Sequence, residues 1–276
     1  MDANPNQYPP VLPPLRQPRP TFWERVKKAL VPVGVVGILL LKWLAKLKLL
    51  ILPLLKFLPI ILKTGGTMFI SIWAYTLFWG WPFAVGFVLL LLVHECGHLL
   101  VAKRVGLKVS APMFIPFMGA IILLKDAPKN AWIEAQVGIG GPLLGSLGAL
   151  VCIGIYAATG NRFFLGLAYT GFFLNLFNLA PSGFLDGGRI VTALSPWLWV
   201  VGIVILGYLM VTHFNFIILL IFVTSLPRLF SLFRKKTAEE ARYFEVTPAQ
   251  RWIMAALYFG LAAGLVLGMD VIQFLP

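Results

Sequence analysis

Long apolar segments, separated by short polar or proline-containing stretches, make up most of the chain. Residues 65–81 and 83–103 are apolar runs on either side of Pro82, and residues 132–158 and 163–181 form a second such pair. Each run is long enough to approach or reach the length of about 17–25 residues that a helix needs to cross a membrane. The pattern therefore predicts two pairs of membrane-spanning helices in this part of the chain.

Three further apolar segments follow in the second half of the chain. Residues 196–212 and 214–227 form a shorter pair around His213, and a last apolar run covers residues 252–272. A polar and charged stretch lies between residue 227 and this last run. Together the segments predict an all-α polytopic membrane protein with about six to seven transmembrane helices.

A short apolar stretch of a different kind lies between the second and third predicted spans. Residues 113–124 are apolar, but Pro112, Pro116 and Gly119 are unfavourable in a helix. Non-helical backbone is tolerated at membrane depth only where protein or water satisfies its polar groups. We therefore expect a short re-entrant segment, similar to a β-hairpin, at residues 109–124.

The first 63 residues do not follow the pattern of clean apolar spans. Residues 1–30 contain seven prolines in their first twenty positions, which predicts a disordered, Pro-rich cytoplasmic tail. Residues 31–63 are apolar but include five lysines and two interrupting prolines, which is typical of a basic amphipathic segment lying at the membrane surface. The membrane domain is accordingly predicted at 64–276, with its core at 65–190.

Composition and charge agree with this class of protein. The 276 residues are 59% hydrophobic and only 12% charged, and the mean hydropathy is +0.89. The net charge of +13 comes from Lys and Arg residues scattered at the ends of apolar segments, which is the positive-inside pattern rather than a phosphate-binding face. We expect contact with membrane lipid and not with nucleic acid.

The positions of the basic residues also predict how the chain is oriented in the membrane. These residues flank the hairpin segment and follow residue 227, so both of these loops are expected on the cytoplasmic side. The chain is then a multi-pass protein of a cell inner or plasma membrane. Its oligomeric state is not indicated by the sequence.

Three ionisable residues interrupt the apolar run at 83–103. His94 and His98 are four residues apart, so on a helix they lie on one face and can bind one Zn²⁺ together. Glu95 lies about 100° further round, where it can reach a water on the metal without being a ligand. The alternative is a buried hydrogen-bonded cluster or a proton relay. Cys96 is predicted to point away and to pack in the core.

A catalytic zinc site needs a third protein ligand as well as an open position. Of the ten acidic residues, Asp186 in "NLAPSGFLDGGR" is the one that remains a candidate after those outside or at the ends of the apolar segments are set aside. His98 is about 24 Å below the outer end of its helix, and residues 163–181 descend about 27 Å from the same side. Asp186 is thus predicted at the depth of His98, and its alternative role is to cap the next helix.

The two motifs together resemble those of the site-2 protease family of zinc intramembrane metalloproteases. "HECGH" matches the family's HExxH, and "NLAPSGFLDGG" matches its N-x-x-P-x-x-x-L-D-G-G, over about residues 65–190. The resemblance implies zinc ligands at His94, His98 and Asp186, a general base at Glu95, and a substrate that is itself a transmembrane segment. Asn178 matches the Asn of the second motif, which implies a polar contact near the site that positions the substrate; an interhelical hydrogen bond is the alternative.

The sequence departs from the family at one position. "GGPLLG" at 140–145 resembles a Gly-Pro motif that ends in Asn in many relatives, whereas Gly145 stands here. A substrate-orienting role for that Asn is therefore in doubt, and the glycines of this segment are expected to allow close helix packing. Neither a PDZ domain nor a cystathionine-synthase-like module is expected.

The function expected from these features is zinc-dependent cleavage of a peptide bond in or near a transmembrane segment of another membrane protein. Two alternatives stay open. One is a zinc-binding membrane transporter or sensor, in which the cluster binds metal without hydrolysing anything. The other is an inactive scaffold that binds single-span proteins.

Overall fold

The computed structural model describes residues 66–234 and 237–275, together with nine single positions between Thr21 and Lys46. All of those nine except Thr21 are helical. The predicted tail at 1–30 and the basic segment at 31–63 fall almost wholly outside the described residues. Their limits, and the limits of the membrane domain, therefore stay predictions.

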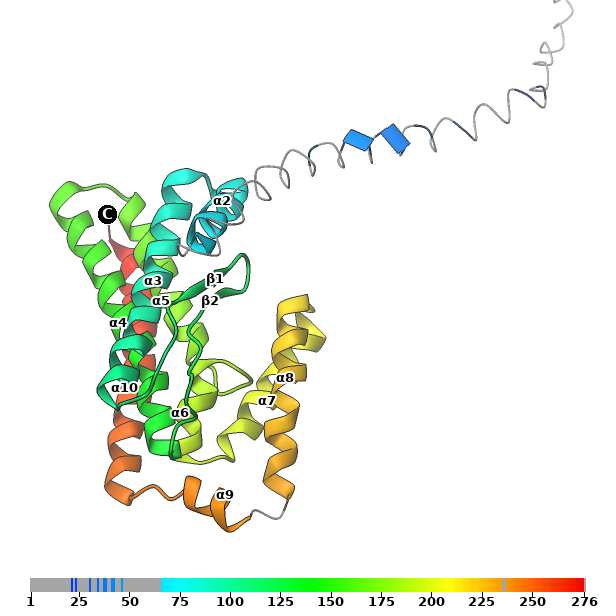
Figure 1. The fold of residues 1–276 in the computed structure, drawn as a ribbon. Helices are drawn as coiled ribbons and strands as arrows, with labels where there is room; N and C mark the ends of the chain where they lie inside the picture. The colour runs from blue at the N-terminus through cyan, green and yellow to red at the C-terminus, as the bar shows by residue number, and fades with distance from the viewer. Residues whose placement is uncertain are drawn as a thin grey trace, which may run out of the picture. The chain divides into compact units, whose positions relative to one another are not determined.

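Helices dominate the described residues (Figure 1). The apolar helices are α2 (Thr67–Trp79), α3 (Trp81–Arg104), α4 (Ala131–Thr159), α5 (Phe163–Asn178), α7 (Leu198–Thr212), α8 (Phe216–Phe233) and α10 (Pro248–Phe274). By length and composition, α3, α4, α8 and α10 are able to cross a membrane, whereas α2, α5 and α7 are shorter apolar helices. The predicted mostly helical, polytopic membrane protein is confirmed. Two short helices that the apolar pattern did not indicate, α6 (Asp186–Leu194) and α9 (Ala238–Tyr243), complete the set.

Several helix ends differ from the predicted ones. The break between α2 and α3 is at Gly80, whose φ is 75°, and Pro82 lies in the first turn of α3. Glycine adopts this conformation without strain and proline is tolerated in a first turn, so the break comes before the proline. The helix predicted to end at 227 instead continues through Pro227 to Phe233, which places Arg228 inside α8 rather than in a loop.

The expected hairpin at 109–124 is present. Strands β1 (Met113–Ile115) and β2 (Gly119–Ile121) pair antiparallel, and a bridge between Val109 and Leu124 extends the pairing. The backbone N–H groups of Phe114 and Phe117 donate to Thr67 Oγ1 and Tyr75 Oη, at 3.2 and 3.1 Å. The hairpin is thus held against α2 by two hydrogen bonds. Its entry into a membrane stays a prediction.

Helix α4 contacts four other helices, α3, α5, α6 and α10. The contact with α3 is a backbone contact: a Cβ on Gly97 would lie 2.1 Å from the carbonyl oxygen of Gly140. Small residues allow helices to approach this closely without side chains between them. The predicted role of the glycines in close packing therefore agrees with the structure.

A polar cluster centred on Arg228 joins residues of five helices. Its Nη1 donates to the Gly188 carbonyl at 2.7 Å, and its Nη2 is 3.3 Å from Glu134 Oε1. The hydroxyl of Tyr243 donates to Glu134 Oε2 at 2.8 Å, and the guanidinium lies 5.2 Å from the centre of the Trp199 ring. Burial and the charge of Glu134 raise the pKa of Tyr243 above its usual value, so its hydroxyl remains a donor at neutral pH. The cluster fixes α8 and α9 to α4 and α6.

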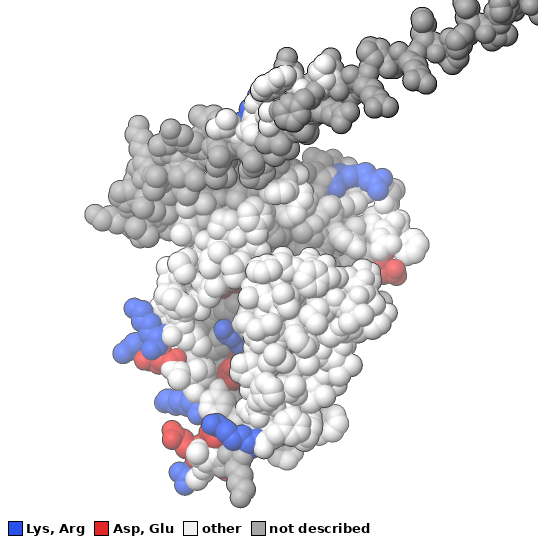
Figure 2. Space-filling model, turned by 90° about the vertical axis from the view of Figure 1, so that its right-hand side faces the viewer, with Lys and Arg blue, Asp and Glu red and all other residues white. Residues whose placement is uncertain are grey.

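Charged side chains are unevenly distributed over the face drawn in Figure 2. Most of the coloured residues lie towards the lower end, where Figure 1 places α9, and a broad white surface lies above them. A narrow crevice opens on this face, and charged side chains are visible inside it. An uncharged surface next to a charged end is what a helical protein in a membrane requires.

Replacing Arg228 with alanine tests the polar cluster. We expect Arg228→Ala to lower the free energy of unfolding by about 1.5–3 kcal/mol, because it leaves Glu134 and the Gly188 carbonyl without this partner. Arg234→Ala is the matched control, since the Arg234–Glu240 ion pair is exposed and should contribute at most about 1 kcal/mol. Unfolding in detergent micelles measures both changes, and equal losses would contradict the assignment.

Candidate metal centre

Three buried side chains converge between α3 and the start of α6. His94 and His98 lie one turn apart on α3, and Asp186 is the first residue of α6. The two Nε2 atoms are 3.1 Å apart, and Asp186 Oδ2 lies 3.1 Å from that of His94 and 3.2 Å from that of His98. The three residues are 2–6% exposed. Among the described residues they form the one group of three or more potential metal ligands.

The separations of these donor atoms fit a metal ion. Ligands arranged tetrahedrally at about 2.0–2.1 Å from Zn²⁺ are about 3.3 Å from one another, close to the observed 3.1–3.2 Å. Two imidazoles and one carboxylate are also the donor set of open zinc sites, in which a fourth position is free for water or substrate. The geometry thus passes the test for a metal centre with three protein ligands.

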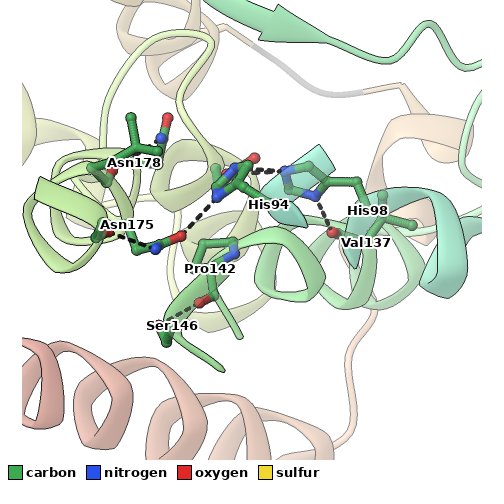
Figure 3. Close-up of polar contacts among 10 residues, drawn as sticks. His94, His98, Val137, Pro142, Ser146, Asn175 and Asn178 are labelled. Carbon is green, nitrogen blue, oxygen red and sulfur yellow. Dashed lines mark hydrogen bonds and ion pairs between the residues drawn. The ribbon is translucent and has the colours of Figure 1, made fainter. Parts of the chain in front are cut away.

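Hydrogen bonds on the far side of each imidazole determine which nitrogen faces the centre (Figure 3). Nδ1 of His98 is 2.7 Å from the Val137 carbonyl oxygen, and Nδ1 of His94 is 2.7 Å from Asn175 Oδ1. Both oxygens can only accept, so in each neutral ring Nδ1 carries the proton. Each Nε2 then presents its lone pair towards Asp186, as a metal ligand must.

The start of α6 places Asp186 in the centre. The N-cap of α6 is Leu185, and no side chain caps this end, so Asp186 does not act as the N-cap. A Cβ on Gly187 would lie 2.0 Å from the Leu179 carbonyl oxygen, which shows how closely this turn packs on the end of α5. Residues with a larger side chain at 187 would push the start of α6, and the carboxylate with it, away from the end of α5.

Gly141 supplies the space in which the donors meet. An added Cβ at this position of α4 would lie 2.2 Å from His98 Nε2 and 2.8 Å from His94 Nε2. Any side chain there would occupy the metal position or displace an imidazole. The sequence pattern indicated close packing for the glycines of this segment, but it gave no sign that Gly141 faces the histidines.

Glu95 lies next to His94 on α3 and is 6% exposed. Its carboxylate is not among the donor atoms that lie within 4.8 Å of one another. Cys96, which the sequence predicted to face away, is half-buried and its thiol is free. Glu95 is thus beside the three donors without being one of them.

The asparagine that reaches the centre is Asn175 and not Asn178. Asn178 Nδ2 donates to the Leu174 carbonyl in its own helix at 3.0 Å, which is not the interhelical hydrogen bond considered for it. Its substrate-positioning contact stays a prediction. Asn175 is three residues earlier on α5, about 60° around the helix axis from Asn178. A polar amide within the apolar run "FFLGLAYTGFFLNLFN" was the available signal.

A substitution at Gly141 tests whether the donors meet there. We expect Gly141→Ala to lower the affinity for Zn²⁺ by more than about tenfold, since the change acts on the ligands themselves rather than on their supports. Gly154→Ala in the same helix is the control, because an added Cβ there has nothing within 4 Å. Competition with a chromophoric chelator in detergent measures both affinities. Equal affinities would place the metal elsewhere.

Comparison with known proteins agrees with this centre. Residues 82–161 match the family model of peptidase family M50. The chain is 36% identical over 135 residues to the zinc metalloprotease MJ0392 of Methanocaldococcus jannaschii, covering 45% of this chain and 37% of that protein. It is 30% identical over 162 residues to the probable chloroplastic zinc metalloprotease EGY2 of Arabidopsis thaliana, covering 43% and 29%.

The matched part of the chain spans about a third of the length of these curated relatives. The match to the family model includes His94, Glu95 and His98. These matches confirm the predicted resemblance to the site-2 protease family, peptidase family M50.

Proposed function

We propose that this protein is a zinc-dependent intramembrane endopeptidase that cleaves a peptide bond in or near a transmembrane segment of another protein. The observation that carries the proposal is the buried convergence of His94, His98 and Asp186 beside Glu95. His94, Glu95 and His98 lie on α3, which is long and apolar enough to cross a membrane. The names of the two curated relatives, both zinc metalloproteases, support the same activity.

His94, His98 and Asp186 would hold the zinc ion. Bound at such a site, Zn²⁺ supplies Lewis acidity towards a carbonyl group and towards water. The three side chains would leave one coordination position free, and the space beside Gly141 lies next to the Nε2 atoms of both histidines. A site that only stores metal is usually closed by a fourth protein ligand, and no fourth His, Cys, Asp or Glu joins the group among the described residues.

Glu95 is the proposed general base and general acid. Its carboxylate takes a proton from the attacking water, whose oxygen bonds to the scissile carbonyl carbon. The same proton then passes from Glu95 to the amide nitrogen as the carbon–nitrogen bond breaks, which leaves a carboxylic acid and an amine. The low exposure of Glu95 keeps other water from competing for this proton.

The proposed substrate is a transmembrane segment that must first lose its helical structure locally. Carbonyl groups inside a helix are hydrogen-bonded and shielded, so they are poor targets for water. An extended segment could instead pair with an edge of the β1–β2 hairpin, as peptides do when they add a strand to a sheet. The outer side of β1 is already engaged at Phe114 by Thr67, which favours β2 as the pairing edge.

We place the centre towards the cytoplasmic side of the membrane. Helix α3 ends at Lys103 and Arg104, about one and a half turns beyond His98. Basic residues at the end of a span favour the cytoplasmic face, so water would have a short path to the site. The crevice with charged side chains in Figure 2 is consistent with such a path.

The Glu95→Gln variant tests the proposed general base. We expect cleavage to fall by at least about 100-fold, because glutamine cannot accept the proton, while the protein still binds about one zinc ion. Membrane proteomics of cells with the active protein or with Glu95→Gln would identify candidate substrates as fragments that persist in the variant. Purified protein and substrate in liposomes then give the rate. Full activity of the variant would contradict the assignment.

The Asp186→Asn variant tests the third ligand. We expect zinc affinity to fall by about 100-fold or more, because the change removes the anionic donor and keeps the shape of the side chain. Chelator competition in detergent measures the zinc affinity, with Asp126→Asn in the exposed loop as the control.

Zinc flux into liposomes without proteolysis would instead support the transporter alternative, and zinc binding with neither flux nor cleavage would support the scaffold.

A further inference from the structure

The amide of Asn175 is buried between His94 and the backbone of its own helix (Figure 3). The residue is 1% exposed. Its Nδ2 donates to the Gly171 carbonyl oxygen at 2.7 Å, and its Oδ1 lies 2.7 Å from His94 Nδ1. Because the Gly171 carbonyl can only accept, the NH₂ group must face it and the oxygen must face the histidine. The orientation of the amide is therefore determined by its surroundings.

Gly145 on the neighbouring helix α4 leaves the space that this amide fills. An added Cβ at Gly145 would lie 2.3 Å from Asn175 Oδ1 and 2.8 Å from its Nδ2. No side chain at 145 could coexist with the amide in its present position. The absence of a side chain on α4 and the presence of an amide on α5 are thus two parts of one arrangement.

The two histidines differ in what holds them. His98 donates from Nδ1 to the backbone carbonyl of Val137, an acceptor that any residue at 137 would provide. His94 donates to a side chain, so its acceptor depends on the residue type at position 175. Without that acceptor, the Nδ1–H of a buried imidazole would lose its partner, and the proton could move to Nε2.

We propose that Asn175 is the positioning residue for His94, and that Gly145 is the residue that makes room for it. The amide oxygen keeps the proton on Nδ1 and the ring in place, so that Nε2 presents its lone pair beside those of His98 and Asp186. The proposal rests on the proposed metal-binding role of His94. It assigns to Asn175 no contact with the substrate or with the metal.

Two substitutions at position 175 separate positioning from packing. Asn175→Leu keeps the approximate volume but removes the acceptor, so we expect zinc affinity to fall by about 10- to 100-fold. Asn175→Asp keeps an acceptor for Nδ1–H, and we expect affinity within about threefold of the original protein, because carboxylates commonly hold metal-bound histidines. A packing role predicts the reverse order, since leucine preserves the apolar contacts whereas aspartate buries a charge and loses the Gly171 hydrogen bond.

Gly145→Ala provides an independent route to the same effect. Its Cβ must displace the amide, so we again expect a loss of about 10- to 100-fold in zinc affinity with Asn175 itself unchanged. Ser146→Ala is the matched control: Ser146 is the next residue on α4, is buried, and donates only to the Pro142 carbonyl of its own helix. We expect its affinity to equal that of the original protein.

Chelator competition on the purified full chain gives the zinc affinities, and size-exclusion chromatography in detergent shows which variants fold. Unchanged affinity in Asn175→Leu or in Gly145→Ala would overturn the proposal. If Asn175→Leu fails to fold, Asn175→Asp and Gly145→Ala decide: retained affinity in the first with loss in the second supports positioning, and any other pattern overturns it. Failure of the original protein to bind zinc would instead refute the metal centre itself.

Discussion

The convergence of three donor atoms within 3.1–3.2 Å of one another is the constraint on which the rest of the fold depends. Side chains as short as Asp186 reach a common point with two histidines only if their backbones approach closely. Gly97 against Gly140 brings α3 onto α4, and Gly187 brings the first turn of α6 onto the end of α5. Ordinary side chains at these contacts would hold the helices at the usual 8–10 Å between axes.

Close approach alone would leave the donors free to turn, and the surrounding polar groups restrict them. Acceptors behind the two imidazoles direct both Nε2 atoms inwards. On the other side, the Gly188 carbonyl, two residues after Asp186, receives hydrogen bonds from Trp199 and Arg228. The turn that carries the carboxylate is therefore held from outside the centre as well. Small residues decide where the backbones lie, and buried hydrogen bonds decide where the side chains point.

The local parts of this arrangement could be predicted from the sequence. Apolar runs located the long helices, proline and glycine located the hairpin, and the four-residue spacing put His94 and His98 on one face. Counting the rise per residue along the two helices also predicted that Asp186 lies level with His98, and in the structure the two side chains are 3.2 Å apart. These inferences succeed because each rests on helix geometry or on the local preferences of proline and glycine, which a chain follows whatever its neighbours are.

What could not be predicted is the rotation of each helix about its own axis. Asn175 and Asn178 differ by three residues, or about 60° around α5, and the motif favoured the one that proves to bond within its own helix. The position of Arg228 was missed for the same reason. A charge after an apolar run indicates the end of a span, yet Arg228 lies inside α8 and pairs with Glu134 of α4, 94 positions away. A long apolar helix has no amphipathic stripe to show which side faces its neighbours. Its rotation is set by interior partners such as Gly145 and Glu134, and these become identifiable only when the packed helices are seen together.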